Sequence, residues 1–389
     1  MEKESPIKAL AKVLTEKPLL RCLIYAAALL PLLLFREATP TNELKYLTIA
    51  DEALRDGHFW CFFLDGAPYA DKPPLYFWII MAMRSLLGEH CIPILELFSL
   101  IPALGTILVM ERWCRDRLRP EYSVAAELAL LTSAWFLGSA VVLRMDMLMT
   151  LFITLAMRES WRILEEGPSG KRQWLFGLYV FLAIFSKGPV GFLLPFVCTA
   201  VYLLFAGKRG DFRKIWGWRA WCAVALPCLL WWGMVYAEGG SGYINDLLVH
   251  QTVGRAVDAF HHKRPFYFYL YSIWYAMGPW AFVSLTVAVS SAIRGRKFPP
   301  TARYFLIVAT SFLIMMSCVS GKLEIYLLPV FGYFHYGAMF LLQQMEVEEG
   351  KAPLANGLRR VLTIGGLVML AAVLLCSIFF MDKVNALLA

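Results

Sequence analysis

The chain has 389 residues, of which 59% are hydrophobic and 17% are charged, and its mean hydropathy is +0.59. A soluble domain is about 45–50% apolar and about 25% charged, so the surplus apolar surface of this chain must face lipid. The composition excludes a disordered chain, a coiled coil, a collagen and a small disulfide scaffold, and it indicates a polytopic membrane protein.

The charged residues and the cysteines exclude further classes of protein. The formal net charge is +8, but in a membrane protein the side on which positive charges lie matters more than their sum, so no nucleic-acid partner is expected. The nine cysteines form no CxxC pair and no zinc-finger spacing. The charged segment before the first apolar run lacks a small-residue cleavage site, which favours an uncleaved first anchor.

Apolar runs divide the chain into candidate membrane helices. A helix needs about 20 apolar residues to cross the hydrocarbon, whereas segment 74–87 is too short and carries Arg84, so we expect it to lie in the interface. We therefore predict an all-α polytopic fold of about 11 transmembrane helices, forming one domain over residues 1–389 with no soluble C-terminal domain. The eleven runs are 18–35, 91–110, 122–143, 145–160, 174–186, 189–206, 220–237, 265–293, 304–320, 326–343 and 361–381.

Positive charges assign a side to each loop. With the N-terminus in the cytoplasm, the loops on that side and the N-terminal segment carry 25 of the 37 Lys and Arg residues, as the positive-inside rule requires. Several outward cations stand singly at helix ends, where an isolated charge is costly unless it is paired or liganded. This favours a site for an anionic ligand on the outward side. These cations are Lys45, Lys72, Arg144, Lys187, Arg255 and Lys322.

Residues 36–90 form the first outward segment, which begins with the longest and least membrane-like loop. Apolar residues at helical spacing predict a surface helix there, with Glu43 and Lys45 on its polar face. Asp71 and Lys72 are followed directly by two prolines, which fix φ and disfavour helix at the preceding residue. We therefore expect the Lys72 ammonium at headgroup depth, where lipid phosphates lie.

Four later outward segments carry similar residues: Arg144-Met145-Asp146, Ser186-Lys187-Gly188-Pro189, the run from His250 to Pro265, and the run from Gly321 to Pro329. Each has a plain structural explanation when taken alone. The lysines can snorkel, Tyr326 can belong to an aromatic belt, and the basic residues before Pro265 can attract anionic headgroups.

Taken together, these motifs resemble a known family. The order NELKY, ADKPPLYFW, RMD, SKGP, HxxxxR, HxxPFxFY, GPW and SGKxxxYLLP is similar to that of the polyprenyl-phosphate-sugar glycosyltransferases. These include the protein O-mannosyltransferases, and the chain most resembles the lipid A aminoarabinose transferase branch. The resemblance implies a GT-C fold with a cavity above the bilayer. It also implies inverting transfer of a sugar from polyprenyl (undecaprenyl) phosphate at the outer face of the cytoplasmic (inner) membrane.

The resemblance also implies roles for individual residues. Fixed cations aimed at the donor phosphate stabilise the charge that develops on it when the sugar leaves. The donor-binding residues would be Lys72, Lys187, Arg255 and Tyr326. Asp146 matches the acidic residue after the third crossing. Asp71 and His250 match positions that can hold a divalent cation such as zinc.

One departure from the family bears on the acceptor. The family's Asp-Glu pair is Asn42-Glu43 here, and its following Arg is Lys45. A hydroxyl acceptor needs its proton removed during attack, whereas a phosphate acceptor is already ionised. The change therefore favours a glycolipid acceptor such as a lipid A phosphate over a protein hydroxyl, although Glu43 or Asp146 could still serve as the base.

Two other classes of function remain open. A transporter or flippase of lipid-linked sugars would use ionisable residues along a path, and Glu96 and Glu127 lie inside apolar runs, but the chain has no internal repeat. A non-catalytic subunit that binds polyprenyl lipids is also possible, since Asn42 suggests lost activity.

Overall fold

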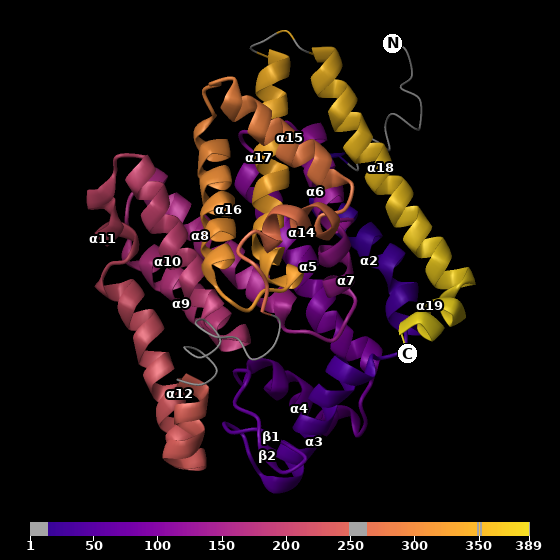
Figure 1. The fold of residues 1–389 in the computed structure, drawn as a ribbon, viewed down its shortest axis with the longest axis vertical. Coiled ribbons are helices and arrows are strands. Elements are labelled where there is room, and N and C mark those ends of the chain that lie inside the picture. The colour runs from indigo at the N-terminus through magenta and orange to yellow at the C-terminus, as the bar shows by residue number, and fades with distance from the viewer. Residues whose placement is uncertain (1–14, 249–262, 348–349, 351, 389) are drawn as a thin grey trace.

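The computed structural model describes residues 15–248, 263–347, 350 and 352–388, and Figure 1 shows their arrangement. Apart from one short antiparallel hairpin, the regular elements of these residues are helices. The all-α architecture expected from the composition is therefore confirmed.

The first part of the chain forms one long helix, α2, and then a group of short elements. We name these short elements, from Pro40 to Leu87, the cap. Gly57 directly follows α3 and Gly88 directly follows α4, and both glycines have the left-handed conformation that this residue adopts without strain. In Figure 1 the cap lies at one end of the bundle, beside one end of the helix α12 (Trp218–Asn245). The elements are α2 (Pro18–Phe35), η1 (Pro40–Leu44), α3 (Lys45–Asp56), β1 (Phe63–Leu64), β2 (Ala67–Pro68) and α4 (Leu75–Leu87). Both predicted helices of the first outward segment are thus present.

The middle of the chain supplies the helices that carry the cap. Helices α8 and α9 run antiparallel and pack along each other, and α9 also packs on α12. The elements are α5 (Ile92–Cys114), α6 (Pro120–Leu131), α7 (Ala134–Ala140), α8 (Asp146–Glu166), α9 (Gly170–Lys187), α10 (Val190–Phe205), η2 (Arg209–Asp211) and α11 (Phe212–Ile215).

The last third surrounds the most buried helix of the described residues. Most residues of the span Glu324–Val347, which contains α17, are buried, and α17 packs against α16, α15, α6 and α18, so it forms the centre of the bundle. The elements are α14 (Phe268–Ala276), α15 (Trp280–Ile293), α16 (Pro300–Cys318), η4 (Glu324–Leu327), α17 (Leu328–Val347), α18 (Ala352–Phe379) and α19 (Met381–Leu388).

Two predicted spans are broken in the structure. The run 122–143 is divided into α6 and α7, which meet at an angle of 72°. The Thr132 hydroxyl bonds back to Leu128 O at the break. The run 265–293 is divided at Gly278, whose φ is +64°, because Pro279 cannot continue the preceding helix.

The predicted count of eleven spans is not confirmed. Among the described residues, six helices are long and apolar enough to cross a membrane, or seven if the bent pair α6 and α7 is one span. Helices α10 and α15 contain only 16 and 14 residues, and α8 carries charged residues along its second half. The chain is nevertheless a multi-pass membrane protein.

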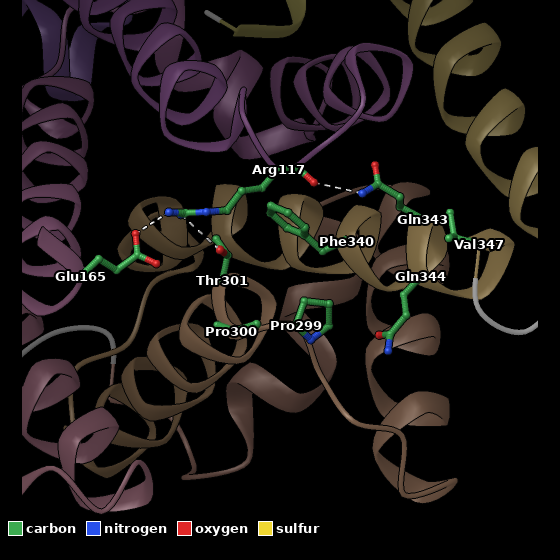
Figure 2. Close-up of a pocket in the computed structure, with 9 residues that line it drawn as sticks. All are labelled: Arg117, Glu165, Pro299, Pro300, Thr301, Phe340, Gln343, Gln344 and Val347. Atoms are coloured by element: carbon green, nitrogen blue, oxygen red, sulfur yellow. Dashed lines mark hydrogen bonds and ion pairs between the residues drawn. The ribbon is translucent and has the colours of Figure 1, made fainter.

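At the end opposite the cap, residues of α8, α16 and α17 and of the segments before α6 and α16 line a small pocket of about 270 Å³ (Figure 2). Arg117 donates a hydrogen bond to Glu165 there, and Gln343 donates to the carbonyl oxygen of Arg117. Helix α8 reaches from Asp146 at the cap end to the neighbourhood of this pocket, so the two ends are separated by about 30 Å at 1.5 Å per residue. The basic loops 111–121 and 294–303 therefore lie far from the predicted site.

Candidate functional site

Helices α8 and α9 bring two predicted site residues into direct contact. Asp146 is the first residue of α8 and Lys187 is the last residue of α9, and the Lys187 ammonium donates to Asp146 Oδ1. Arg144 Nε donates to Asp146 Oδ2 at 3.1 Å. The Asp146 side chain is 1% exposed and that of Lys187 is 9% exposed, so a buried carboxylate holds two cations in place.

Two further segments converge on Lys187. The ammonium lies 5.0 Å from the ring centroid of Tyr326, which η4 carries. Burial lowers the pKa of the Lys187 ammonium, and the positive charges of Arg144 and of Lys72, in the first outward segment, lower it further, so Lys72 lies within electrostatic range of Lys187. Three of the four predicted donor-binding residues are therefore neighbours, although they are far apart in sequence.

The segment around Lys72 is itself held by polar contacts. Lys72 Nζ lies 2.7 Å from Asp71 Oδ2, and the Tyr69 hydroxyl donates to the same oxygen at 3.2 Å. The Lys45 ammonium lies 5.1 Å from the centroid of the Tyr69 ring. This part of the cap thus carries a second pair of cations beside the Arg144–Asp146–Lys187 group.

Charge counting defines what this arrangement can bind. We name the four cations and two carboxylates the outer charge cluster. Cations outnumber carboxylates in it, and the Lys187 ammonium is repelled by both Arg144 and Lys72, so a phosphate lying among these cations would be stabilised. Its members are Lys45, Asp71, Lys72, Arg144, Asp146 and Lys187.

Glu43 lies in a different environment from the one predicted. Its carboxylate is 1% exposed and accepts hydrogen bonds from Arg36 Nη2 at 2.6 Å, from Leu143 N at 2.7 Å and from Thr39 N at 2.7 Å. Burial opposes ionisation, but these bonds hold the pKa of the Glu43 carboxyl below its ordinary value. The contacts favour a structural role for Glu43 over that of a general base.

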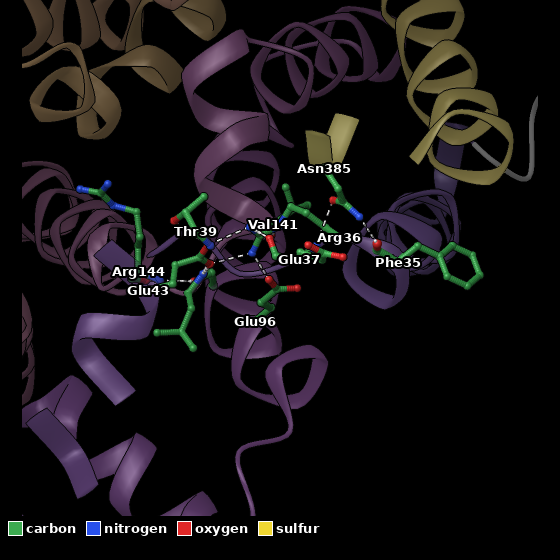
Figure 3. Close-up of polar contacts among 11 residues, drawn as sticks. Phe35, Arg36, Glu37, Thr39, Glu43, Glu96, Val141, Arg144 and Asn385 are labelled. Carbon is green, nitrogen blue, oxygen red and sulfur yellow. Dashed lines mark hydrogen bonds and ion pairs between the residues drawn. The ribbon is translucent and has the colours of Figure 1, made fainter. Parts of the chain in front are cut away.

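Arg36 was missed by the sequence analysis and is the centre of this second group, shown in Figure 3. It also donates to Glu96 of α5 and to Val141 O, and it joins the end of α2 to the segment that precedes Asp146. Ser99 Oγ donates to Arg144 O at 2.9 Å, which fixes the same segment from α5. The available signal was a lone arginine directly after the first apolar run.

Glu43→Gln is expected to lower the free energy of unfolding at neutral pH by roughly 1–3 kcal/mol, because Arg36 and two backbone amides lose an ionised partner. A carboxyl whose folded pKa is depressed stabilises the protein above its unfolded pKa of about 4.3. That contribution is lost as the pH falls through the folded pKa. Unfolding temperatures measured from pH 7 to pH 3 should therefore converge for the two proteins in acid, and a constant difference would contradict this role.

The other predicted residues have different outcomes. The Asn42 side chain is exposed on η1. Lys322 is 2% exposed and donates to the carbonyl oxygens of Arg264 and Val319, so it holds the segment after α16 rather than an outward ligand. His250 and Arg255 lie outside the described residues, and their roles stay predictions.

The metal prediction rests on Asp71 and His250. Where the structure describes the chain, it contains no group of three or more His, Cys, Asp and Glu side chains that could hold a metal ion. The Lys72 ammonium lies against the Asp71 carboxylate, in the place that a cation would take. A zinc ion held by Asp71 and His250 stays a prediction, because His250 lies outside the described residues, and we derive no step through one.

Glu96 and Glu127, the carboxylates that a transport path would need, are both paired. Glu127 accepts two hydrogen bonds from Arg21, at 2.7 and 2.6 Å. Each carboxylate therefore joins two helices, as expected for a buried packing contact.

Comparison with known proteins supports the fold. Residues 71–232 match the model of the dolichyl-phosphate-mannose-protein mannosyltransferases. The crystal structure of ArnT from Cupriavidus metallidurans bound to undecaprenyl phosphate has a TM-score of 0.73 and 17% identity, over 94% of this chain and 72% of that one. Its apo state has a TM-score of 0.72 and 18% identity, over 95% and 76%. The predicted GT-C fold is confirmed.

Curated relatives extend the match beyond the region of the family model. The undecaprenyl phosphate-alpha-4-amino-4-deoxy-L-arabinose arabinosyl transferase of Edwardsiella ictaluri is 28% identical over 341 residues, which is 86% of this chain and 60% of that protein. The transferase of the same name from Pseudomonas paraeruginosa is 26% identical, over 74% of this chain and 52% of that protein. The resemblance to this glycosyltransferase family is confirmed. The chain spans between half and two thirds of the length of these relatives.

Proposed function

We propose that the chain is an inverting glycosyltransferase that moves a sugar from an undecaprenyl phosphate carrier to an envelope acceptor. The observation that carries the proposal is the outer charge cluster, in which Asp146 holds Lys187 and Arg144, Asp71 holds Lys72, and the Lys187 ammonium lies against the Tyr326 ring. The names of the curated relatives, which specify an undecaprenyl phosphate-linked aminoarabinose, support this donor class.

The chemistry of the cluster suits the departure of a lipid phosphate. The acceptor oxygen attacks the anomeric carbon while the bond from that carbon to the phosphate oxygen breaks, and the electron pair leaves with the polyprenyl phosphate. An ammonium has three N–H donors, so Lys187 can keep Asp146 and also donate to a phosphate oxygen. Lys72 adds a second cation, and the Tyr326 hydroxyl can add a hydrogen bond.

The state of the carboxylates favours an acceptor that is already ionised. Asp146 accepts from two cations and Glu43 accepts from Arg36 and two amides, and a carboxylate in such contacts is a poor base. A phosphate acceptor needs no base. A phosphate of a lipid A-type glycolipid is therefore the proposed acceptor, rather than a protein hydroxyl.

Charge asymmetry supports a location at the outer face of the inner membrane. The outer charge cluster lies at the opposite end of α8 from the basic loops, which the positive-inside rule assigns to the cytoplasm. We expect cysteines introduced at Arg115 and Gly210 to resist a membrane-impermeant thiol reagent in intact cells and to react after permeabilisation. Labelling of either position in intact cells would overturn the orientation.

The activity can be tested with purified protein in nanodiscs. We expect the protein to release undecaprenyl phosphate from undecaprenyl phosphate-aminoarabinose only when lipid A is added, and to place the sugar on lipid A with inverted anomeric configuration. Transfer to a Ser/Thr peptide instead would favour a protein O-mannosyltransferase-like activity. Movement of the donor across liposomes without any glycoside product would favour a flippase.

A further inference from the structure

A carboxylate of α12 attaches this helix to the turn that follows α3. Glu238 accepts hydrogen bonds from three consecutive backbone amides, those of Phe59, Trp60 and Cys61, and the bond from Cys61 N measures 2.9 Å. Successive amides that converge in this way form a nest for an anion, and here the chain's own side chain fills it. The turn cannot leave α12 without exposing this charge and these amides together.

Tyr243 makes a second attachment, at the base of the hairpin. Its hydroxyl accepts from Phe62 N at 2.8 Å and donates to Tyr69 O at 3.0 Å, so it joins the residues that flank β1 and β2. The Tyr69 hydroxyl donates in turn to Asp71, which holds Lys72. Tyr69 therefore links α12 to Lys72, with its backbone oxygen bonded to Tyr243 and its hydroxyl bonded to Asp71.

The helix α12 is shaped for this contact by two glycines. Gly240 has a φ of +70°, which bends the helix between the two attachments. A Cβ added at Gly239 would lie 2.5 Å from the Cys61 sulfur and 2.8 Å from Tyr243 Cβ. Only glycine at position 239 lets the helix approach the turn this closely, so the bent part of α12 packs directly against the turn at Cys61.

The same turn rests on the end of α9 through aromatic rings. Trp60 packs edge-on against Trp78 at 4.8 Å, and Trp78 packs against Phe185 at 5.3 Å. Phe185 lies two residues before Lys187. The segment that carries Lys72 is thus supported by α12 on one side and by the helix that carries Lys187 on the other.

We propose that Glu238 and Tyr243 are positioning residues that hold Lys72 at the distance from Lys187 which the donor phosphate requires. They act through the turn and the hairpin and touch no reacting atom. The inference rests on the proposed function, because it assigns the phosphate of that donor to the space between the two lysines.

Cys61 offers a native reporter for this attachment. It is fully buried against Gly239, whereas Cys91 is partly exposed, and both are free thiols. Alkylation of each cysteine can be followed by peptide mass spectrometry of the full chain in nanodiscs. The dissociation constant of undecaprenyl phosphate is measured on the same samples.

The variants are Glu238→Gln and Tyr243→Phe, with the exposed residues Glu89→Gln and Tyr271→Phe as matched controls. Because bonds to a charged group or a buried hydroxyl are lost, we expect alkylation of Cys61 relative to Cys91 to rise about tenfold, and binding of undecaprenyl phosphate to weaken about tenfold. Glu238→Asp keeps the charge and should recover part of the affinity. The controls should match the wild type in both measurements.

Several outcomes would overturn the proposal. Unchanged affinity in Glu238→Gln and Tyr243→Phe would do so, whether or not Cys61 alkylation rises, because the attachment would then be merely structural. If Glu238→Gln does not fold, the affinity of Tyr243→Phe for undecaprenyl phosphate is the test of the proposal, because this substitution removes only one oxygen. A wild-type protein that does not bind undecaprenyl phosphate would instead defeat the proposed function, while Cys61 alkylation would still report whether the turn is attached.

Discussion

Replacing Asp146 by Asn is expected to lower the turnover of sugar transfer by roughly 10²–10³-fold, the usual effect of removing one preorganised electrostatic group. Asp146 accepts from both Lys187 and Arg144, so its loss releases two cations from the positions in which they would face the donor phosphate of the proposed reaction. The substitution preserves the shape of the side chain. Turnover is measured with purified protein, and folding is checked by the unfolding temperature.

Asp382→Asn provides the matched control, because Asp382 is an exposed carboxylate of α19. It should transfer sugar at the wild-type rate. Wild-type turnover in Asp146→Asn would remove Asp146 from the site. An equal loss in the Asp382 variant would show that the assay responds to surface charge.

Among the Glu43, Arg36 and Arg55 variants, Arg36→Met is expected to lower the free energy of unfolding most, by about 3–5 kcal/mol. The reason is that a buried ion pair that loses one partner leaves uncompensated charge. Arg36 is 4% exposed at its side chain and pairs with both Glu43 and Glu96, which are 1% and 0% exposed. Two carboxylates would then face each other without a cation. The measurement is the unfolding temperature of the purified protein.

Arg55→Met tests whether burial is the cause. Arg55 also pairs with a carboxylate, that of Asp56, but the two side chains are 68% and 40% exposed. Exposed pairs contribute about 0–1 kcal/mol, so this variant should unfold close to the wild-type temperature. Equal losses in the two arginine variants would contradict the account of the Arg36 group.

Much of the outer charge cluster could be predicted from the sequence, because its residues interrupt apolar runs on one side of the membrane. A lone cation at a helix end needs a partner, and Lys187 and Arg144 find one in Asp146. What the sequence could not show is which carboxylate faces the outward site and which is buried in a structural ion pair. Glu43 stands beside Lys45 on a predicted surface helix, yet it turns inward to Arg36, a contact that depends on how α2 meets the cap.

The number of spans was less predictable, because hydropathy shows where a helix can cross but not where it bends. Thr132 and Ser133 look like part of one apolar run, and their hydroxyls bond back to the preceding turn where the chain breaks. The indole of Trp280 and the imidazole of His335 then bond to these hydroxyls from other helices. Such a break is stabilised by tertiary contacts that no local pattern reveals.

The central claim is tested most directly by the mass spectrum of lipid A from cells that carry the protein, lack it, or carry Asp146→Asn. The account predicts an added mass of one aminopentose on lipid A in the presence of the wild-type protein and its absence in the other two strains. Lipid A of identical mass in all three strains would contradict the proposed acceptor. An added mass that persists with Asp146→Asn would contradict the proposed site.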